Sequence, residues 1–399
     1  MRPSLRQYLT VTGSYWGFTL SDGALRILVL FHFSTLGYSP FTLALLFLLY
    51  EAAGIIANLG GGWLATRFGI PRMLLLGMVL QVLGLMLLSC LDPAFDPVLS
   101  VIWVLVAQGI AGLAKDITKT ASKSAIKVVR IDEGEGLFRW VAWFTGSKNA
   151  MKGLGFLLGG VMLTTIGFRG GLWLMAGLLG LLAVLVAVTL PAKLGAGVSS
   201  KTIRELFSKS SVVNTISAAR FFLFGARDIW FVVALPVFLY ANGWSFWEVG
   251  GFLAIWTILY GGVQGIAPAI MRVTTTGTDS RVGTVGWVVA LALVPLGLLG
   301  FMMVNPDVSV LISGLLVFGV VFAVNSSLHS FLIVAYAGSK KAAEDIGFYY
   351  AANAAGRLAG TFMSGFLYQQ GGLLACLAGS ALFLVTTALV VTRLPQPEI

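Results

Sequence analysis

The stretch PAKLGAGVSSKTIRELFSKSSV, residues 191–212, is the longest polar and basic break in a sequence dominated by apolar runs. The run before it, GLWLMAGLLGLLAVLVAVTL at 171–190, has the length of a membrane span, about 20 apolar residues. The break divides the chain into a half at 1–190 and a half at 213–399. We therefore predict two membrane-embedded halves joined by a cytoplasmic linker.

The composition excludes a water-soluble globular protein. Of the 399 residues, 58% are apolar and only 11% are charged, and the mean hydropathy is +0.92. Soluble domains carry roughly 25% charged residues. Apolar runs separated by charged or Gly/Pro-rich breaks predict an all-α integral membrane protein with twelve transmembrane helices. The predicted spans are 9–36, 41–65, 73–91, 98–122, 138–165, 171–190, 213–241, 247–271, 283–304, 308–337, 346–369 and 373–392.

Positive charge gathers in the loops of one side. The formal net charge is +10, and the loops on the side of the N-terminus carry nearly all loop Lys and Arg residues, whereas the opposite loops carry only Arg169. The positive-inside rule predicts cytoplasmic termini in a cell inner membrane. Because so little soluble surface remains, we expect no nucleic-acid partner.

The two halves match each other weakly, but at a nearly constant offset. LGYSPF at 36–41 aligns with NGWSFW at 242–247, an offset of 206. Offsets between 205 and 210 also pair charged or polar residues: Asp22 with Asp228, Lys152 with Arg357, and Lys119 with His329. This repeat predicts two pseudo-symmetric six-helix halves, an arrangement in which a transporter rocks around a midplane site.

Two short motifs resemble those of a known family. GWLATRFGIPR at 62–72 resembles the cytoplasmic loop motif Gly-x-Leu-Ala-Asp-Arg-x-Gly-Arg-Lys of the major facilitator superfamily, with Thr66 in place of the aspartate. GFLLGG at 155–160 is similar to the Gly-Pro-x-x-Gly-Gly antiporter motif of that superfamily, with Phe156 in place of the proline. The resemblance extends over the whole chain and implies the major facilitator fold.

A narrower resemblance rests on SYWGFTLSDGALR at 14–26, GLAKDITKTASKSAIK at 112–127 and TGSKNAMKGLGFLLGG at 145–160. These stretches resemble the organoarsenical efflux permeases of the ArsJ branch. That family exports 1-arseno-3-phosphoglycerate, the unstable ester made when glyceraldehyde-3-phosphate dehydrogenase uses arsenate in place of phosphate. The resemblance implies efflux of this organoarsenical, arsenate resistance and a functional link to the dehydrogenase.

The charges inside the predicted spans independently point to an anionic ligand. A charge at the bilayer centre costs roughly 2.5–3.5 kcal/mol on insertion scales, so each needs a partner or a watery cavity. Nine bases lie inside the spans or at their inner ends: Arg26, Lys115, Lys119, Lys123, Lys148, Lys152, Arg220, Arg227 and Arg357. Four acids accompany them: Asp22, Glu51, Asp116 and Asp228. Nine bases against four acids predict a cavity in which the substrate supplies the missing negative charge.

Helical spacing indicates which bases bind the substrate. Lys115 and Lys119 stack on one face of the fourth span, and Lys148 and Lys152 on one face of the fifth. A rise of about 1.5 Å per residue brings Lys152 near the midplane. Its repeat mate Arg357 would complete a clamp for a doubly anionic ligand. The predicted substrate-binding residues are Arg26, Lys115, Lys119, Lys148, Lys152, Arg227, His329 and Arg357.

The rival explanation for these bases is structural. Lys119 can snorkel to the inner interface, and Arg357 can pair with an inward-facing acid. His329 lies in a polar patch of the tenth span, where it can hydrogen-bond a neighbouring hydroxyl instead of an anion.

The acids are candidates for proton coupling. Glu51 has no cation on its own helix, so desolvation favours its protonated form unless a cation on a neighbouring helix is close. Asp22 lies one turn before an arginine of its own span, with which it can pair. Asp228 is expected to face away from the adjacent Arg227 and toward Arg220. The predicted proton-coupling residues are Asp22, Glu51 and Asp228.

Other functional classes fit less well. An excess of buried positive charge has the wrong sign for a pump of cationic drugs, but it fits a carrier of another organophosphate or organic anion equally well. Cys90 and Cys376 lie far apart and the chain has two histidines, so we expect no metal, no cofactor and no enzymatic site. No phosphate-binding Gly-x-x-x-x-Gly-Lys-Ser/Thr loop occurs. The sequence therefore predicts a monomeric secondary transporter in the lipid bilayer.

Overall fold

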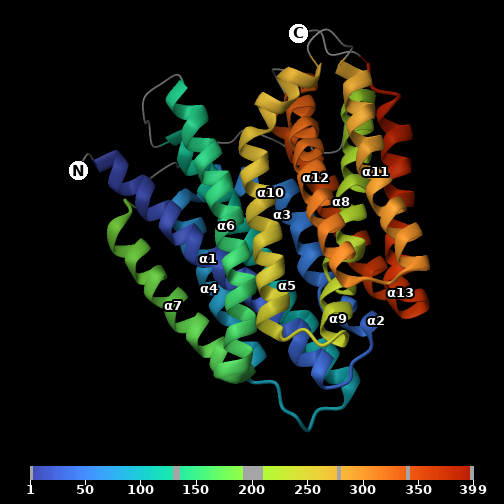
Figure 1. Ribbon diagram of the computed structural model, residues 1–399. Coiled ribbons are helices and arrows are strands. Elements are labelled where there is room, and N and C mark those ends of the chain that lie inside the picture. The colour runs from blue at the N-terminus through green and yellow to red at the C-terminus, as the bar shows by residue number, and fades with distance from the viewer. Residues whose placement is uncertain (1–2, 129–134, 192–209, 276–279, 338–341, 396–399) are drawn as a thin grey trace. The chain divides into compact units, whose positions relative to one another are not determined.

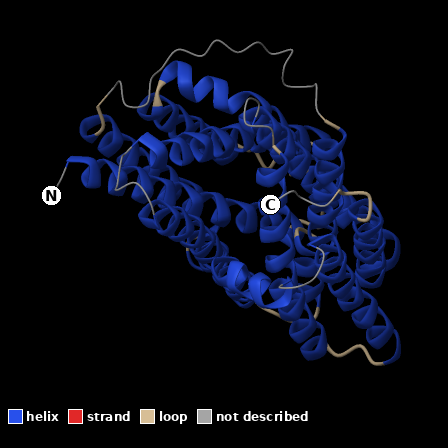
Figure 2. Cartoon of the chain, turned by 90° about the horizontal axis from the view of Figure 1, so that it is seen from above, coloured by secondary structure: helices blue, strands red, loops and turns tan. Residues whose placement is uncertain are grey.

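A computed structural model describes residues 3–128, 135–191, 210–275, 280–337 and 342–395, so most of the predicted linker lies outside the described residues. Within these ranges the chain is helical and contains no strand (Figures 1 and 2). The helices are α1 (Pro3–Thr35), α2 (Pro40–Leu45), α3 (Leu48–Phe68), α4 (Ile70–Ser89), α5 (Pro97–Val128), α6 (Glu135–Thr165), α7 (Gly167–Thr189), α8 (Ser211–Phe231), α9 (Ala234–Ala241), α10 (Phe246–Thr275), α11 (Ser280–Val304), α12 (Val308–Tyr336) and α13 (Ala342–Val391). The prediction of an all-α membrane protein is confirmed.

The twelve predicted spans coincide with these helices, although three boundaries differ. The second span contains α2 and α3, and the seventh contains α8 and α9. The last two spans form α13, which is interrupted at Gly371 and Gly372. Gly372 has φ 62°, a left-handed conformation that favours glycine, so the backbone turns there between two helices.

Within the described residues, nine stretches are long and apolar enough to cross a membrane. The stretch Asp345–Val391 holds the last two predicted spans. The first and fifth predicted spans form helices α1 and α6 but are not among the nine. Both helices carry the charged residues of the site described below, which lowers their hydropathy.

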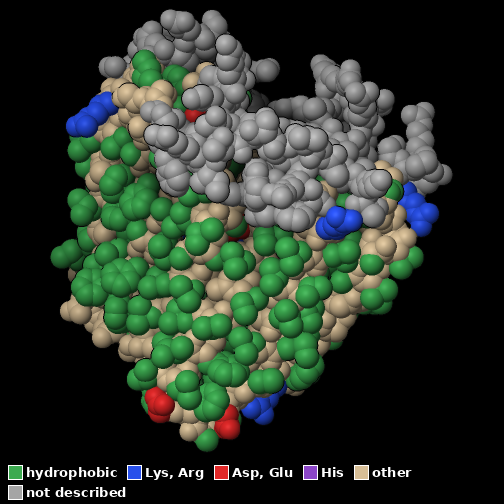
Figure 3. All heavy atoms as spheres, turned by 180° about the vertical axis from the view of Figure 1, so that it is seen from behind, with side chains coloured by type: hydrophobic (Ala, Val, Ile, Leu, Met, Phe, Trp, Pro, Cys, Tyr) green, Lys and Arg blue, Asp and Glu red, His purple; other side chains and the backbone are tan. Residues whose placement is uncertain are grey.

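The exposed side chains of the helices are largely apolar. On α7, Leu181 is 68% exposed and Val188 is 80% exposed. Figure 3 shows apolar side chains over most of one face, with charged side chains near its ends. A contiguous apolar surface of this kind requires an apolar surrounding, which the hydrocarbon core of a bilayer supplies.

Contacts divide the chain into two compact units. Unit 1 comprises Met1–Gly37, Leu46–Lys201 and Trp244–Ile258, and unit 2 comprises Tyr38–Leu45, Thr202–Gly243 and Leu259–Ile399. Helix α2 therefore belongs to unit 2, and the first half of α10 belongs to unit 1. The division at the linker into two six-helix halves stays a prediction.

Glycines make the closest helix contacts within each unit. In unit 1, a Cβ on Gly155 of α6 would lie 2.3 Å from the carbonyl oxygen of Leu20 on α1. In unit 2, a Cβ on Gly360 of α13 would lie 2.6 Å from the carbonyl oxygen of Gly225 on α8. Both partners of the second contact follow those of the first by 205 positions, so the contact recurs at the offset of the sequence repeat.

A second glycine contact recurs in the same way. A Cβ on Gly160 of α6 would lie 2.4 Å from the carbonyl oxygen of Phe246, which begins α10. A Cβ on Gly365 of α13 would lie 2.4 Å from the carbonyl oxygen of Pro40, which begins α2. Gly160 therefore packs against Trp244–Ile258, the segment that unit 1 takes from the second part of the chain. Gly365 packs against Tyr38–Leu45, the segment that unit 2 takes from the first part.

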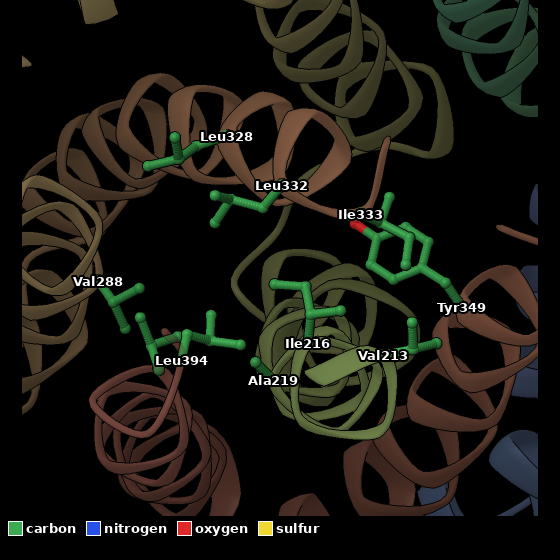
Figure 4. Packing of buried hydrophobic residues seen from close by; sticks show 10 residues of the cluster. Val213, Ile216, Ala219, Val288, Leu328, Leu332, Ile333, Tyr349 and Leu394 are labelled. Carbon is green, nitrogen blue, oxygen red and sulfur yellow. The ribbon is translucent and has the colours of Figure 1, made fainter. Parts of the chain in front are cut away.

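The core of unit 2 fixes α8 against α12 and α13. Val213, Ile216 and Ala219 of α8 are buried with Leu328 and Leu332 of α12, as Figure 4 shows. Close packing of these side chains determines where the polar residues that follow them on each helix are held.

Substitution of Gly356 tests the glycine packing. A Cβ at this position would lie 2.1 Å from the backbone oxygen of Phe221, so Gly356→Ala forces α13 away from α8. We expect a loss of about 1–3 kcal/mol in unfolding free energy, as for other overpacked sites, seen as a lower melting temperature of the purified protein in detergent. Gly297→Ala is the matched control, because nothing lies within 4 Å of its Cβ. Equal melting temperatures of the two variants would contradict this account.

Candidate functional site

Buried charges of unit 1 meet between α1, α3 and α5. Arg26 donates through Nη2 to Glu51 Oε1 at 2.5 Å, and the two side chains are 8% and 1% exposed. Lys115 Nζ lies 4.0 Å from the other oxygen of Glu51 and 3.4 Å from Asp116. We call this group, with Asp22, Tyr50 and Lys119, cluster 1.

Tyr50 lies at the centre of cluster 1. Its hydroxyl donates to Asp22 Oδ1 at 2.5 Å. Its ring faces two cations, with Lys115 Nζ 3.9 Å and Arg26 Cζ 5.3 Å from the ring centroid. A cation over a tyrosine face is attracted by the ring quadrupole, and more strongly where water is excluded. Tyr50 therefore stabilises both charge signs of the cluster.

Lys119 ends cluster 1 on α5. Its Nζ donates to Asp116 Oδ1 at 2.9 Å and to Asn58 Oδ1 on α3 at 3.1 Å. Lys115 and Lys119 therefore share one face of α5, as their spacing predicts, and both contact Asp116.

A glycine allows cluster 1 to assemble. A Cβ on Gly112 would lie 2.3 Å from the carbonyl oxygen of Tyr50, so only glycine lets α5 approach α3 this closely. Lys115 follows Gly112 by three residues and therefore lies on the same helix face. The close approach brings its ammonium group to Tyr50 and Glu51.

Cluster 1 pairs bases with acids of the chain. Three bases, Arg26, Lys115 and Lys119, meet three acids, Asp22, Glu51 and Asp116. The argument for Glu51 as a proton carrier required that no cation of a neighbouring helix lie close to it, and this condition is not met, because Arg26 of α1 donates to its carboxylate. Asp22 also accepts from Tyr50 instead of pairing with the arginine one turn later on its own helix.

The two lysines of α6 belong to the same unit. Lys148 and Lys152 are both half-buried. Lys152 Nζ lies 5.8 Å from the ring centroid of Phe156, one turn further along α6. Gly23 of α1 packs against the backbone here, since its Cβ would lie 2.6 Å from the carbonyl oxygen of Lys152.

Unit 2 holds a second group of charges, cluster 2, between α8 and α13. Asp228 is fully buried and accepts from Arg227 Nε at 2.6 Å and from Arg357 Nε at 3.2 Å. The expectation that Asp228 faces away from Arg227 is wrong. The arginine side chain is long enough to curve round the helix, so neighbouring residues reach each other.

The approach of α13 to α8 explains this pairing. A Cβ on Gly360 would lie 2.8 Å from the Cβ of Asp228, so a larger residue would separate the helices. Arg357 precedes Gly360 by three residues and lies on the same face of α13. The guanidinium group of Arg357 is thereby held at Asp228, and the structural pairing of Arg357 with an acid is realised.

Arg220 lies two turns before Arg227 on α8 and has neutral partners. Its Nε donates to Asn353 Oδ1 at 2.9 Å and its Nη1 donates to the carbonyl oxygen of Ser326 at 3.0 Å. The predicted pairing of Asp228 with Arg220 is therefore replaced by hydrogen bonds to an amide and to a backbone carbonyl. His329, three residues after Ser326 on α12, is fully buried.

Cluster 2 carries more positive than negative charge. Arg227 and Arg357 share the single carboxylate of Asp228. Asp345, buried at the start of α13, is a further acid that the sequence analysis assigned to a loop. It does not contribute to the hydrogen bonds of Asp228 or Arg220 described above. Two guanidinium groups and one carboxylate thus meet between α8 and α13.

The side chains of Thr66, Lys123 and Lys127 lie outside the part of the chain that the structure describes. The sequence analysis also missed some residues that contribute to the clusters. Tyr50, Asn58 and Ser326 are the missed residues that contact the charged groups. Their one sequence signal is a polar side chain beside a buried charge within an apolar run. Among the described residues, no three or more His, Cys, Asp or Glu side chains gather as a metal site.

Comparisons with known proteins agree with this architecture. The sequence model of the Major Facilitator Superfamily matches residues 10–337. A comparison with curated proteins gives no significant match.

Solved transporter structures are similar in fold. A POT family transporter in complex with 5-aminolevulinic acid superposes with a TM-score of 0.72 at 15% identity, covering 97% of this chain and 94% of that one. A POT family transporter with a thioalcohol-conjugated peptide gives a TM-score of 0.72 at 15% identity, with coverage of 96% and 95%. The D323A mutant of the nucleoside transporter NupG gives a TM-score of 0.73 at 14% identity, with coverage of 98% and 100%. Identities this low establish the fold alone.

The pair Arg26–Glu51 can be tested by a double-mutant cycle. Glu51→Gln leaves two cations beside an uncharged amide, and we expect a loss of about 3–5 kcal/mol in unfolding free energy, the usual effect of breaking a buried ion pair. Arg26→Gln combined with Glu51→Gln removes both charges and should recover a large part of this loss. Thermal unfolding in detergent measures the unfolding free energy of Arg26→Gln, Glu51→Gln and the double variant. Additive effects of the two substitutions would contradict direct pairing.

Proposed function

The chain belongs to the major facilitator superfamily and is a secondary transporter, not an enzyme, and we propose that it exports a small anionic organoarsenical, 1-arseno-3-phosphoglycerate. Export of this ester would confer arsenate resistance and link the transporter functionally to glyceraldehyde-3-phosphate dehydrogenase. The proposal for this substrate rests on the resemblance of 14–26, 112–127 and 145–160 to the ArsJ branch and on the charges described above.

The observation that carries the anionic substrate is the sharing of Asp228 by Arg227 and Arg357. Two guanidinium groups present about ten N–H donors, whereas one carboxylate offers roughly four acceptor positions. Guanidinium groups bind phosphate and carboxylate oxygens bidentately. An arsenate or phosphate group is therefore a suitable additional ligand for cluster 2.

The chemistry of arsenic supports an arsenate ester over a trivalent arsenic species. Carriers of trivalent arsenic are expected to use clustered thiols. The chain has two cysteines, of which Cys90 is exposed and Cys376 is buried in α13. An arsenate ester instead presents anionic oxygens, for which the chain supplies Arg and Lys.

The second candidate is a carrier of another organophosphate or organic anion, which the excess charge of cluster 2 supports equally. The ligands named for the similar transporters, 5-aminolevulinic acid and a conjugated peptide, show that this fold accommodates chemically different small molecules. Discrimination between the two candidates requires a transport measurement.

The proposed transport cycle uses alternating access in an inner membrane, with both termini cytoplasmic and the protein monomeric. Lys152 and Arg357 would act as a clamp for the doubly anionic substrate, supported by Lys148. Asp22 and Asp228 remain proton-coupling candidates. For Glu51, coupling would require release of Arg26, because the two side chains form an ion pair.

Transport by inside-out membrane vesicles tests the proposed substrate. Vesicles are supplied with arsenate, glyceraldehyde 3-phosphate, the dehydrogenase and its nicotinamide cofactor, and accumulated arsenic is measured with each component omitted in turn. We expect accumulation only with the complete mixture, because the ester forms only then. Vesicles without the transporter are the control.

Accumulation from arsenate alone would contradict the ester as substrate. No accumulation by folded, correctly oriented protein would contradict the organoarsenical and leave the organophosphate candidate, for which radiolabelled 3-phosphoglycerate replaces the mixture.

Neutralisation of Lys152 tests the clamp. Lys152→Gln removes a half-buried charge, and we expect transport in the vesicle assay to fall about 100-fold or more while the amount of folded protein is unchanged, because charge-assisted contacts to the substrate are lost. Arg393→Gln, on an exposed side chain after α13, is the matched control and should transport normally. Retained transport by Lys152→Gln would assign this lysine a structural role only.

A further inference from the structure

A group of polar side chains in unit 2 surrounds Arg220, a residue not included among the predicted substrate-binding residues. Arg220 is 4% exposed, and its two hydrogen bonds within the described part of the chain end on neutral oxygens, Asn353 Oδ1 and Ser326 O. A buried cation is costly unless it is compensated by charge or by a full set of hydrogen bonds. The dipoles of these two neutral groups compensate the charge of the guanidinium group only in part. The uncompensated part of the charge can attract an anion.

His329 lies on α12 one turn after Ser326, whose carbonyl oxygen accepts from Arg220, and it adds unused hydrogen-bonding capacity. It is 0% exposed, and neither of its ring nitrogens has a hydrogen-bond partner among the described residues. Buried polar groups are nearly always hydrogen-bonded, so an unpartnered imidazole calls for a ligand. One ring nitrogen of a neutral imidazole can donate to an anionic oxygen.

The other polar side chains of this group are hydrogen-bonded to one another. Ser326 Oγ lies 3.1 Å from the hydroxyl of Tyr260 and accepts from Gln264 Nε2 at 3.2 Å. Gln264 also donates to the Tyr260 hydroxyl at 2.8 Å. These residues come from α10 and α12, while Arg220 comes from α8. Three helices therefore hold one polar site in place before any ligand arrives.

The ring of Phe224 lies close both to Arg220 and to Arg227 of cluster 2. Arg220 Cζ lies 4.0 Å and Arg227 Cζ lies 5.0 Å from the centroid of its ring, so the two guanidinium carbons are no more than 9.0 Å apart. A spacing of seven residues also puts both arginines on one face of α8. Two cationic groups at this distance match two anionic groups on one short carbon chain.

We infer that unit 2 binds its substrate at two poles, Arg227 with Arg357 at one end and Arg220 with His329 at the other, and so selects a short-chain molecule with an anionic group at each end. This inference rests on the proposed function, and it assigns the second anionic group of the substrate to Arg220 and His329. Inorganic phosphate and singly anionic esters occupy one pole only.

A matched pair of ligands tests the two poles. 3-Phosphoglycerate carries a phosphate and a carboxylate at opposite ends of three carbons, whereas glycerol 3-phosphate has the same chain length and a phosphate only. Dissociation constants are obtained from the ligand concentration dependence of the melting temperature of the full-length protein in detergent. We expect wild-type protein to bind 3-phosphoglycerate at least about tenfold more tightly, because a second charge-assisted contact is formed.

Variants of Arg220 assign this preference to the second pole. Arg220→Gln should weaken binding of 3-phosphoglycerate about tenfold and leave binding of glycerol 3-phosphate unchanged, so that the preference disappears. Arg393→Gln, on an exposed arginine of the same unit, should keep it. If Arg220→Gln does not fold, Arg220→Lys decides the matter, since it keeps the charge but not the bidentate geometry, and its preference should fall several-fold.

Folded Arg220 variants that keep the full preference overturn the second pole. Equal affinity of wild-type protein for the two ligands overturns it as well, while the proposed anion transport stands. Wild-type protein that binds neither ligand but accumulates arsenic in the vesicle assay overturns the two-pole inference alone. Failure of both assays overturns the proposed function with it.

Discussion

A charge inside a bilayer must be compensated by the protein, by water or by a ligand, and this constraint organises the whole structure. In unit 1 the chain itself supplies the compensation: Arg26, Lys115 and Lys119 are matched by acids, and Tyr50 contacts both signs. In unit 2 the two arginines at Asp228 share one carboxylate, and Arg220 rests on neutral oxygens. The two units thus differ in how their bases are compensated. On the proposed function, cluster 1 acts as a scaffold and cluster 2 attracts the anionic substrate.

Compensation across helices needs short distances, which glycine provides. Gly112 brings Lys115 to the backbone of Tyr50, and Gly360 brings Arg357 to Asp228, each from a position one turn away on the same face. Without hydrophobic driving force between helices in lipid, close backbone contact and polar pairing hold a bundle together. The same glycine therefore serves packing and electrostatics. This double role explains why a residue that weakens a helix in water occurs so often beside the buried charges here.

Features that depend on local sequence were predictable, whereas pairing across helices was not. The length of the apolar runs located the spans, and the pair Gly371 and Gly372 marked the break inside α13. Lys115 and Lys119 contact the same acid because helical periodicity alone places them on one face. The partner of Glu51, by contrast, lies on α1 and α5, and which helices adjoin α3 is a property of the tertiary fold. Asp228 shows a further limit, because a long flexible arginine can reach a residue that helical geometry places on another face.

The difference between the clusters also bears on how a substrate can enter without disrupting the fold. Oδ1 of Asp228 accepts from Arg227 and Oδ2 accepts from Arg357, so each arginine uses only part of its fork on this acid. On the proposed function, an oxyanion that binds these arginines need not displace the carboxylate, so helix pairing at Gly360 can persist while the ligand binds. In cluster 1 the same ligand would have to break Arg26 from Glu51 and leave a buried carboxylate uncompensated, at a cost of several kcal/mol. The selective anion binding that we propose for unit 2 therefore depends on its few acids as much as on its arginines.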